Sequence, residues 1–226
     1  MKLKSIILVL LLAAFTDSCQ QETLEEVNDG EIGNITAVIG EKPQFGGIAS
    51  TRTSYESTGE WIQGDAVSVV YTFTNVDGTT TNVSQTITRN TSGSWNASEN
   101  VYIPYTATAV SATMAYIGTT DALTSIKEKI TGSMAAQDIS NPSKNILLPV
   151  NSMTRQNALL RVTGLAAGTV VKIGDYITYT ATDTTDLNCF ITVGTTYAVT
   201  ITPNNMEAKS YTIAQPENGK CYVINL

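Results

Sequence analysis

Apolar and polar residues alternate along most of this chain with the two-residue period that is typical of β-strands. The clearest segment is 66–74, whose large apolar side chains would share one face: Val67, Val69, Tyr71 and Phe73. Asp77-Gly78 follows it and is a typical hairpin turn, so residues 80–89 are expected to return as the next strand. The pattern therefore predicts antiparallel β-structure.

The other alternating segments are short and regularly spaced. In the first half they are 35–39, 51–55, 101–105 and 110–116, with a change of phase near Ala109 that implies a bulge or break. In the second half they are 146–150, 158–163, 170–173, 176–181, 189–193, 197–202, 211–214 and 221–226. A spacing near ten residues, broken by glycine and asparagine turns, is typical of a β-sandwich.

One segment has helical spacing instead. In 121–130, Leu123, Ile126 and Ile130 lie three and four residues apart, and Gly132 could end a short helix. A short connection between two sheets would show the same pattern. A turn at Asn141-Pro142 then predicts a division into two β domains, 34–144 and 145–226.

The first residues form a predicted leader, 1–18. Lys2 and Lys4 precede an uncharged apolar run, 6–15, which is too short to span a bilayer, since that needs about 20 residues. Cys19 stands where a bacterial signal peptidase would leave it as the new amino terminus, so we expect it to carry lipid. Simple secretion, with Cys19 free or removed, is the alternative. The acidic segment 19–33 is expected to be a tether, or else a surface-export signal.

Composition narrows the function. The whole chain of 226 residues has no histidine, which excludes Ser-His-Asp and Cys-His catalysis and histidine-ligated metal sites. The net charge of −7, with no dense Lys/Arg cluster, argues against nucleic acid as a partner. We expect no cofactor, no metal and no enzymatic activity.

Cys189 and Cys221 are the two remaining cysteines. In an exported protein they could form a disulfide, but two buried free thiols would fit the sequence equally well.

Several short motifs, in their order, resemble the fimbrillin-like fimbrial subunits of Bacteroidales. They are the leader with Cys19, Thr51-Arg52-Thr53, Trp61-Ile62-Gln63-Gly64-Asp65, Ser133-Met134-Ala135-Ala136, Ile146-Leu147-Leu148-Pro149-Val150 and Ala158-Leu159-Leu160-Arg161-Val162. The chain departs from that family where Val150-Asn151-Ser152 replaces the frequent Phe-x-His, and its second domain is short.

The resemblance implies two transthyretin-like β-sandwiches, exported as a palmitate-bearing lipoprotein to the outer membrane. It further implies cleavage by an arginine-specific protease, for which Arg52 is the candidate site, and loss of the first strand, 35–39. A strand from a neighbouring fimbrial subunit would then fill the vacant groove. The donor would be the last strand, with Tyr222, Ile224 and Leu226 on one face. Residues 51–53 could instead be a surface strand, and the last strand could complete its own domain.

Two alternatives to a fimbrial role are open. A surface module that does not polymerise could bind a protein or a host glycan, with sugar rings stacked on Trp61, Trp95, Tyr102 and Tyr105. A carboxylate enzyme such as a glycosidase would need two acids from Asp175, Asp183 and Asp186 held close together.

Overall fold

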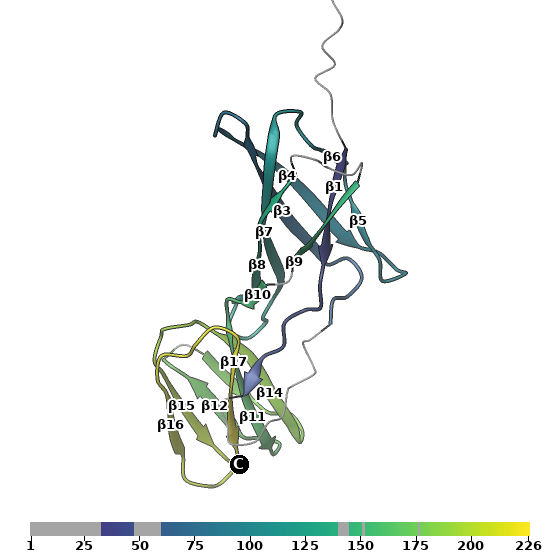
Figure 1. Ribbon diagram of the computed structural model, residues 1–226. Coiled ribbons are helices and arrows are strands. Elements are labelled where there is room, and N and C mark those ends of the chain that lie inside the picture. Colours follow the sequence, from purple (N-terminus) through teal and green to yellow (C-terminus); the bar gives the residue numbers. More distant parts are fainter. Residues whose placement is uncertain (1–32, 48–59, 140–144, 151, 176) are drawn as a thin grey trace, which may run out of the picture.

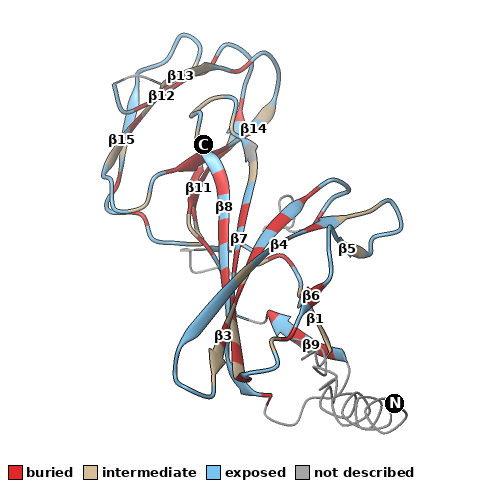
Figure 2. Ribbon diagram, turned by 90° about the horizontal axis from the view of Figure 1, so that it is seen from above, coloured by how far each residue is buried: buried red, intermediate tan, exposed pale blue. Residues whose placement is uncertain are grey.

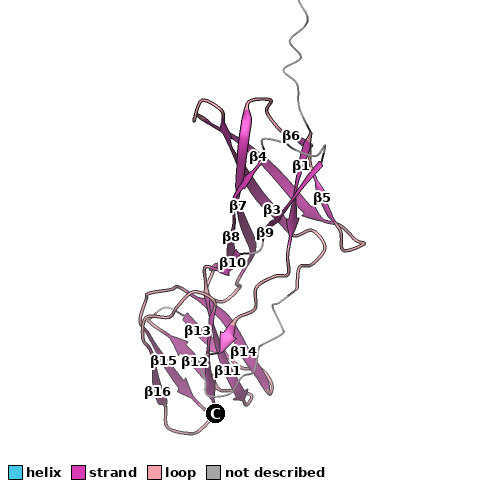
Figure 3. Cartoon of the chain, in the orientation of Figure 1, coloured by secondary structure: helices cyan, strands magenta, loops and turns pink. Residues whose placement is uncertain are grey.

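The computed structural model describes residues 33–47, 60–139, 145–150, 152–175 and 177–226. Within these ranges the chain is all-β, with strands β1 to β17 and no helix (Figure 3). The described part therefore holds no helix long and apolar enough to cross a bilayer. Four sheets pair into two sandwiches, one after the other along the molecule (Figure 1). The predicted all-β fold of two tandem sandwiches is confirmed.

The first sandwich places a three-stranded sheet against a six-stranded one. The small sheet has the order β6-β1-β9, from β6 (Val101–Tyr102), β1 (Asn34–Ile39) and β9 (Asn145–Val150). The large sheet has the order β10-β8-β7-β3-β4-β5, from β10 (Ser152–Arg155), β8 (Lys127–Asp138), β7 (Ala107–Thr120), β3 (Ala66–Asn75), β4 (Thr80–Arg89) and β5 (Trp95–Ala97).

The second sandwich has two four-stranded sheets. One has the order β14-β11-β17-β2, from β14 (Thr185–Ile191), β11 (Ala158–Leu165), β17 (Lys220–Asn225) and β2 (Gly46–Gly47). The other has the order β13-β12-β15-β16, from β13 (Ile177–Thr180), β12 (Val170–Ile173), β15 (Tyr197–Thr202) and β16 (Lys209–Ile213).

Alternation along the strands builds both cores. In β3 every second residue from Val67 to Phe73 is completely buried. Figure 2 shows buried and exposed residues recurring along β7 and β8. The predicted bulge is present: Thr74 faces Ala109 and Asn75 faces Ala107, so β7 has one extra residue there. The hairpin turn is confirmed as well, with Gly78 at φ 81° and the Thr79 amide donating to Asp77 Oδ1.

The division between the sandwiches differs from the predicted one at 144/145. Strand β9 pairs with β1, and β10 pairs with β8, so both belong to sheets of the first sandwich. By sheet topology the second sandwich begins at Ala158, where β11 starts, and it also takes in β2 from early in the chain. The Asn141-Pro142 turn lies outside the described residues. The prediction assumed that each sandwich is one continuous stretch of the chain. Instead, β9 and β10 belong to the first sandwich, and β2 belongs to the second.

The helix considered for 121–130 is wrong. Asp121 Oδ1 accepts the amides of Leu123 and Thr124, and Ser125 has a positive φ of 58°. These features close a turn between β7 and β8, and β8 has begun by Lys127. The segment is therefore neither a helix nor a connection between two sheets, because β7 and β8 are neighbouring strands of one sheet.

Gly132, expected to end that helix, has another role inside β8. A Cβ at this position would lie 2.8 Å from Val150 Cγ1 and 3.0 Å from Met153 Cγ. We predict that Gly132→Ala lowers the free energy of unfolding by about 1–3 kcal/mol through overpacking. The exposed neighbour provides the control, since Ser133→Ala should change it by less than about 0.5 kcal/mol. Equal urea midpoints for the two variants would contradict this packing.

Candidate functional site

Strand β1 is the central strand of the small sheet in the first sandwich. It pairs in parallel with β9 over six residues, from Asn34 opposite Asn145 to Ile39 opposite Val150. On its other side it pairs with β6 only at Asn34 and Ile35. Ile35, Ala37 and Ile39 point into the core and are at most 8% exposed. The strand thus fills a position between β9 and β6 that is apolar on the side facing the core. This position is called the slot of β1 below.

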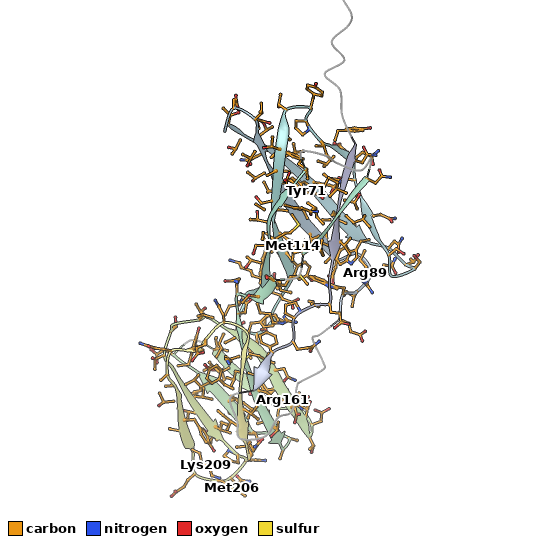
Figure 4. All side chains as sticks on the ribbon, viewed as in Figure 1. Tyr71, Arg89, Met114, Arg161, Met206 and Lys209 are labelled. Carbon is orange, nitrogen blue, oxygen red and sulfur yellow. The ribbon has the colours of Figure 1, made fainter. Side chains whose placement is uncertain are left out.

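A buried tyrosine from the opposite sheet binds the backbone of β1. The Ala37 amide donates to Tyr71 Oη at 3.0 Å, and Tyr71 Oη donates to Gln85 Oε1 at 2.7 Å. The Gln85 side chain in turn donates to the carbonyl of Glu99. Figure 4 shows Tyr71 inside the first sandwich, and burial raises its pKa above the usual value. Because the contact is to a backbone amide, any strand in this slot could make it.

Residues 40–47 carry the chain from the slot to the second sandwich (Figure 1). Trp61 Nε1 donates to the Gly40 carbonyl at 2.8 Å. Phe45 is 1% exposed and packs in a small cluster with Leu159, Phe190 and Cys221. Strand β2 then pairs in parallel with β17. One short segment therefore contacts both sandwiches.

Lys42 lies in the middle of this segment with its ammonium group buried. Its Nζ is 3.0 Å from Glu128 Oε2, and both side chains are 6% exposed. The same Nζ lies 5.3 Å from the ring centre of Trp61 and 5.0 Å from that of Tyr116. Two aromatic rings and a carboxylate are the usual composition of a cation-binding cage.

Arg155 shares Glu128 with Lys42. Its Nη1 contacts Glu128 Oε1, its Nε donates to the Pro43 carbonyl, and its guanidinium carbon lies 4.2 Å from the ring centre of Phe45. Arg155 is 1% exposed, and burial lowers its pKa from the usual value. A second carboxylate, Asp65, accepts from Tyr116 Oη at 2.7 Å. Glu128 is thus paired with two cations out of water, and the Asp65 carboxylate lies nearby, bound by Tyr116.

Burial also affects Tyr116, which lies between the two carboxylates. Desolvation first, and then the hydrogen bond to Asp65, raise the pKa of Tyr116 well above its usual value. The phenol therefore stays neutral and donates its proton to Asp65. A cleft of about 700 Å³, lined by Lys42, Trp61 and Trp95 among others, opens beside this cluster.

Two of the residues predicted from the sequence, Cys19 and Arg52, lie outside the described residues. Lipidation and cleavage at these positions remain predictions. The acidic tether expected at 19–33 lies outside them too, except for Gly33.

The expected donor strand is β17, and here it completes its own sandwich. It pairs in parallel with β11, from Leu159 opposite Cys221 to Thr163 opposite Asn225. Tyr222 and Ile224 pack against the second core, whereas Leu226 is 43% exposed. This arrangement matches the alternative weighed for the last strand, and its role as a donor remains a proposal.

The two thiols do not form a disulfide. Cys189 and Cys221 are both free and buried, on strands separated by β11. Cys189 lies opposite Leu160 and Cys221 opposite Leu159, so their side chains lie on opposite faces of one sheet. Strands two positions apart are separated by roughly 10 Å, beyond the Cα separation of about 7 Å that a disulfide tolerates.

The aromatic residues considered for glycan stacking do not form a common platform. Trp61 is 7% exposed and packs edge-on against Trp95 and Tyr116. Arg89 lies over the Trp95 ring, with 5.8 Å to its centre. Tyr102 and Tyr105 are exposed but do not line the cleft beside these tryptophans. The geometry favours packing for Trp61.

Carboxylates do not gather into a metal site in the described ranges. Within them there is no group of three or more His, Cys, Asp or Glu side chains that could hold a metal ion. Of the three acids considered for glycosidase chemistry, Asp186 forms an ion pair with Arg161 at 2.6 Å.

Sequence reasoning missed the polar residues that matter most around the segment 40–47. Lys42, Glu128 and Arg155 were not predicted as site residues, and Glu128 lay within the segment considered helical. Reading 127–132 as a strand would have placed Glu128 on the same buried face as Ile130 and Gly132. A carboxylate on a buried strand face requires a cationic partner, which is the signal that could have revealed the cluster.

Comparisons with known proteins support the fold. No family profile matches the chain, and no curated protein matches it by sequence. Among solved structures, a fimbrial protein from Bacteroides ovatus ATCC 8483 is similar with a TM-score of 0.58 at 12% identity. The match covers 86% of this chain and 48% of that one, so this chain spans about half the length of that protein.

A candidate cell adhesion protein from Bacteroides fragilis NCTC 9343 is also similar, with a TM-score of 0.45 and 10% identity over 85% of this chain and 91% of that one. By the first likeness, this chain has the fold of a Bacteroides fimbrial protein. The resemblance inferred from the sequence motifs is confirmed at the level of the fold.

We predict that removing the Tyr71 hydroxyl lowers the stability of the protein. Tyr71→Phe leaves the Ala37 amide without an acceptor and Gln85 Oε1 without a donor, both buried, so we expect a loss of about 1–3 kcal/mol in the free energy of unfolding. The partly exposed Tyr102→Phe is the matched control and should be neutral. Urea denaturation measures both, and an unchanged midpoint for Tyr71→Phe would show that the contact contributes nothing.

We predict that the thiols of Cys189 and Cys221 do not react with Ellman's reagent in the folded protein. Burial raises the pKa of Cys189 to about 12 and that of Cys221 to about 11, so neither is a thiolate at pH 8. In a chain carrying Cys19→Ser, Ellman's reagent should find almost no fast thiol in the native state and two per chain in denaturant. No thiol in denaturant would instead reveal a disulfide.

The same raised pKa values fix the direction of the pH dependence. Above about pH 8.5 the unfolded chain loses thiol protons that the folded chain keeps. The stabilising contribution of the two buried thiols to the free energy of unfolding is therefore complete below that pH. It is lost as the pH rises toward 11 and 12.

Proposed function

We propose that this protein is a structural subunit or anchor of a cell-surface fimbria that assembles by exchange of a β-strand. In this proposal the chain is exported as a lipoprotein on Cys19, cut at Arg52, and freed of β1 and β2. A strand of a neighbouring subunit then enters the slot of β1. The role is structural rather than catalytic, and the partners are other subunits.

The observation that carries the proposal is the position of β1. The strand supplies three buried side chains to the first core. Its covalent link to the later strands of that sandwich runs through residues 40 onward. A single cut between Gly47 and Glu60 therefore separates it from every later strand. Removing Ile35 and Ile39 would expose core at a cost of about 1.5–3 kcal/mol for each side chain. That cost favours a replacement strand.

The energetics of replacement support filament growth. The vacant slot offers the β9 edge, which now pairs with six residues of β1, together with an apolar inner face. A contact made by one subunit's strand in another subunit's slot is head-to-tail and does not close on itself. The fold of the fimbrial protein from Bacteroides ovatus agrees with such a role.

Controlled cleavage tests the proposal. Treatment of the purified chain with an arginine-specific protease should remove the residues before Thr53 and convert monomers into polymers, measured by size-exclusion chromatography and electron microscopy. Arg52→Lys should resist that protease but assemble after trypsin, which cuts at either residue. A chain that loses β1 and stays monomeric would refute strand exchange.

The amino-terminal residue of the protein recovered from the cell surface distinguishes an anchor from a stalk subunit. An acylated Cys19 indicates an anchor, and a start at Thr53 indicates a polymerising stalk subunit. Cys19→Ala should abolish acylation and membrane attachment in the anchor case.

A further inference from the structure

We propose that the slot of β1 ends in a receptor for an ammonium group, so that the strand that replaces β1 must bring a lysine or arginine three residues beyond its last core-facing residue. This inference rests on the proposed strand exchange and specifies the partner. The partner is a β-strand with apolar residues at alternate positions, followed at that spacing by a cation. Ile35, Ala37, Ile39 and Lys42 show the pattern in the resident segment.

The receptor is built by residues outside the segment that leaves. Trp61 and Tyr116 offer their rings at 5.3 and 5.0 Å from the Lys42 ammonium, and Glu128 offers a carboxylate oxygen at 3.0 Å. Trp61 precedes β3, Tyr116 lies on β7 and Glu128 on β8. All three therefore stay after a cut at Arg52, whereas Lys42 departs with β1.

Departure of Lys42 unbalances the buried charge. Arg155 then remains as the ionic partner of Glu128, through Oε1, while the buried Asp65 carboxylate lies nearby, hydrogen-bonded to Tyr116. Glu128 Oε2 also loses its ionic partner. Removing one member of a buried ionic group is strongly destabilising because the charge left behind stays out of water without compensation. An incoming cation restores both the balance and the contact.

The remaining polar contacts of the segment are less selective. Trp61 Nε1 donates to a backbone carbonyl at Gly40, and Arg155 Nε donates to one at Pro43. Tyr71 accepts from a backbone amide at Ala37. Any strand in the correct register supplies those groups. Among the contacts described for residues 33–45, the ammonium of Lys42 is the side-chain charge that the slot selects.

The position also sets the register. The side-chain period of a strand is two, so a slip of one residue would turn every core-facing side chain outward. A slip of two would keep the apolar face inward but move the cation by about 7 Å, away from the receptor. The ammonium site therefore distinguishes registers that the apolar slot alone would accept.

A peptide exchange experiment tests the inference on the full chain. A specific protease site is inserted between Gly47 and Glu60, the chain is cut, and a fluorescent peptide of residues 33–47 competes for the slot. The other peptides carry Lys42→Met, Lys42→Arg or Glu41→Gln. Glu41 is exposed, so the last peptide changes charge beside the receptor without entering it.

We expect the native, Lys42→Arg and Glu41→Gln peptides to bind within about threefold of one another. The Lys42→Met peptide should bind roughly 100-fold more weakly, since it leaves the buried Oε2 of Glu128 without the ammonium that pairs with it. Equal binding by Lys42→Met overturns the ammonium receptor and leaves strand exchange intact. Equal weakness of Lys42→Arg and Lys42→Met would overturn it too, because shape rather than charge would then decide. If none of the peptides exchanges, the proposed function itself fails.

Discussion

The carboxylate of Glu128 is buried near the junction of two sandwiches, and cations from two distant parts of the chain neutralise it. Lys42 comes from the segment after the first strand, and Arg155 comes from the strand before the second sandwich. Because a buried charge is costly without partners, the three positions depend on one another. The segment that holds Lys42, residues 40–47, also brings Phe45 into its cluster and β2 to β17.

Local patterns in the sequence predicted most strands well because each has one buried face. Segments 80–89, 170–173 and 197–202 match β4, β12 and β15 residue for residue. The bulge beside Ala109 was also predictable, since an extra residue changes the phase of the alternation. These features depend only on neighbours in the chain, which the sequence displays directly.

The errors concern long-range pairing. Residues 145–155 follow a turn and look like the start of a domain, yet they pair with β1 and β8. One further error was local: Leu123, Ile126 and Ile130 have helical spacing, but the Asp121 carboxylate binds nearby amides and closes a turn instead. The buried cluster was hidden because of long-range pairing, since its members are separated by up to 113 positions, from Lys42 to Arg155.

The parallel pairing of β1 with β9 has a mechanical consequence. Tension applied along such a strand loads all six residue pairs in shear at once, whereas tension across it would open the pairs one after another. A replacement strand with the same pairing would therefore resist extension of a fibre far better than its count of hydrogen bonds suggests. Resistance to flow at a cell surface would then come from the direction of the strand as much as from its affinity.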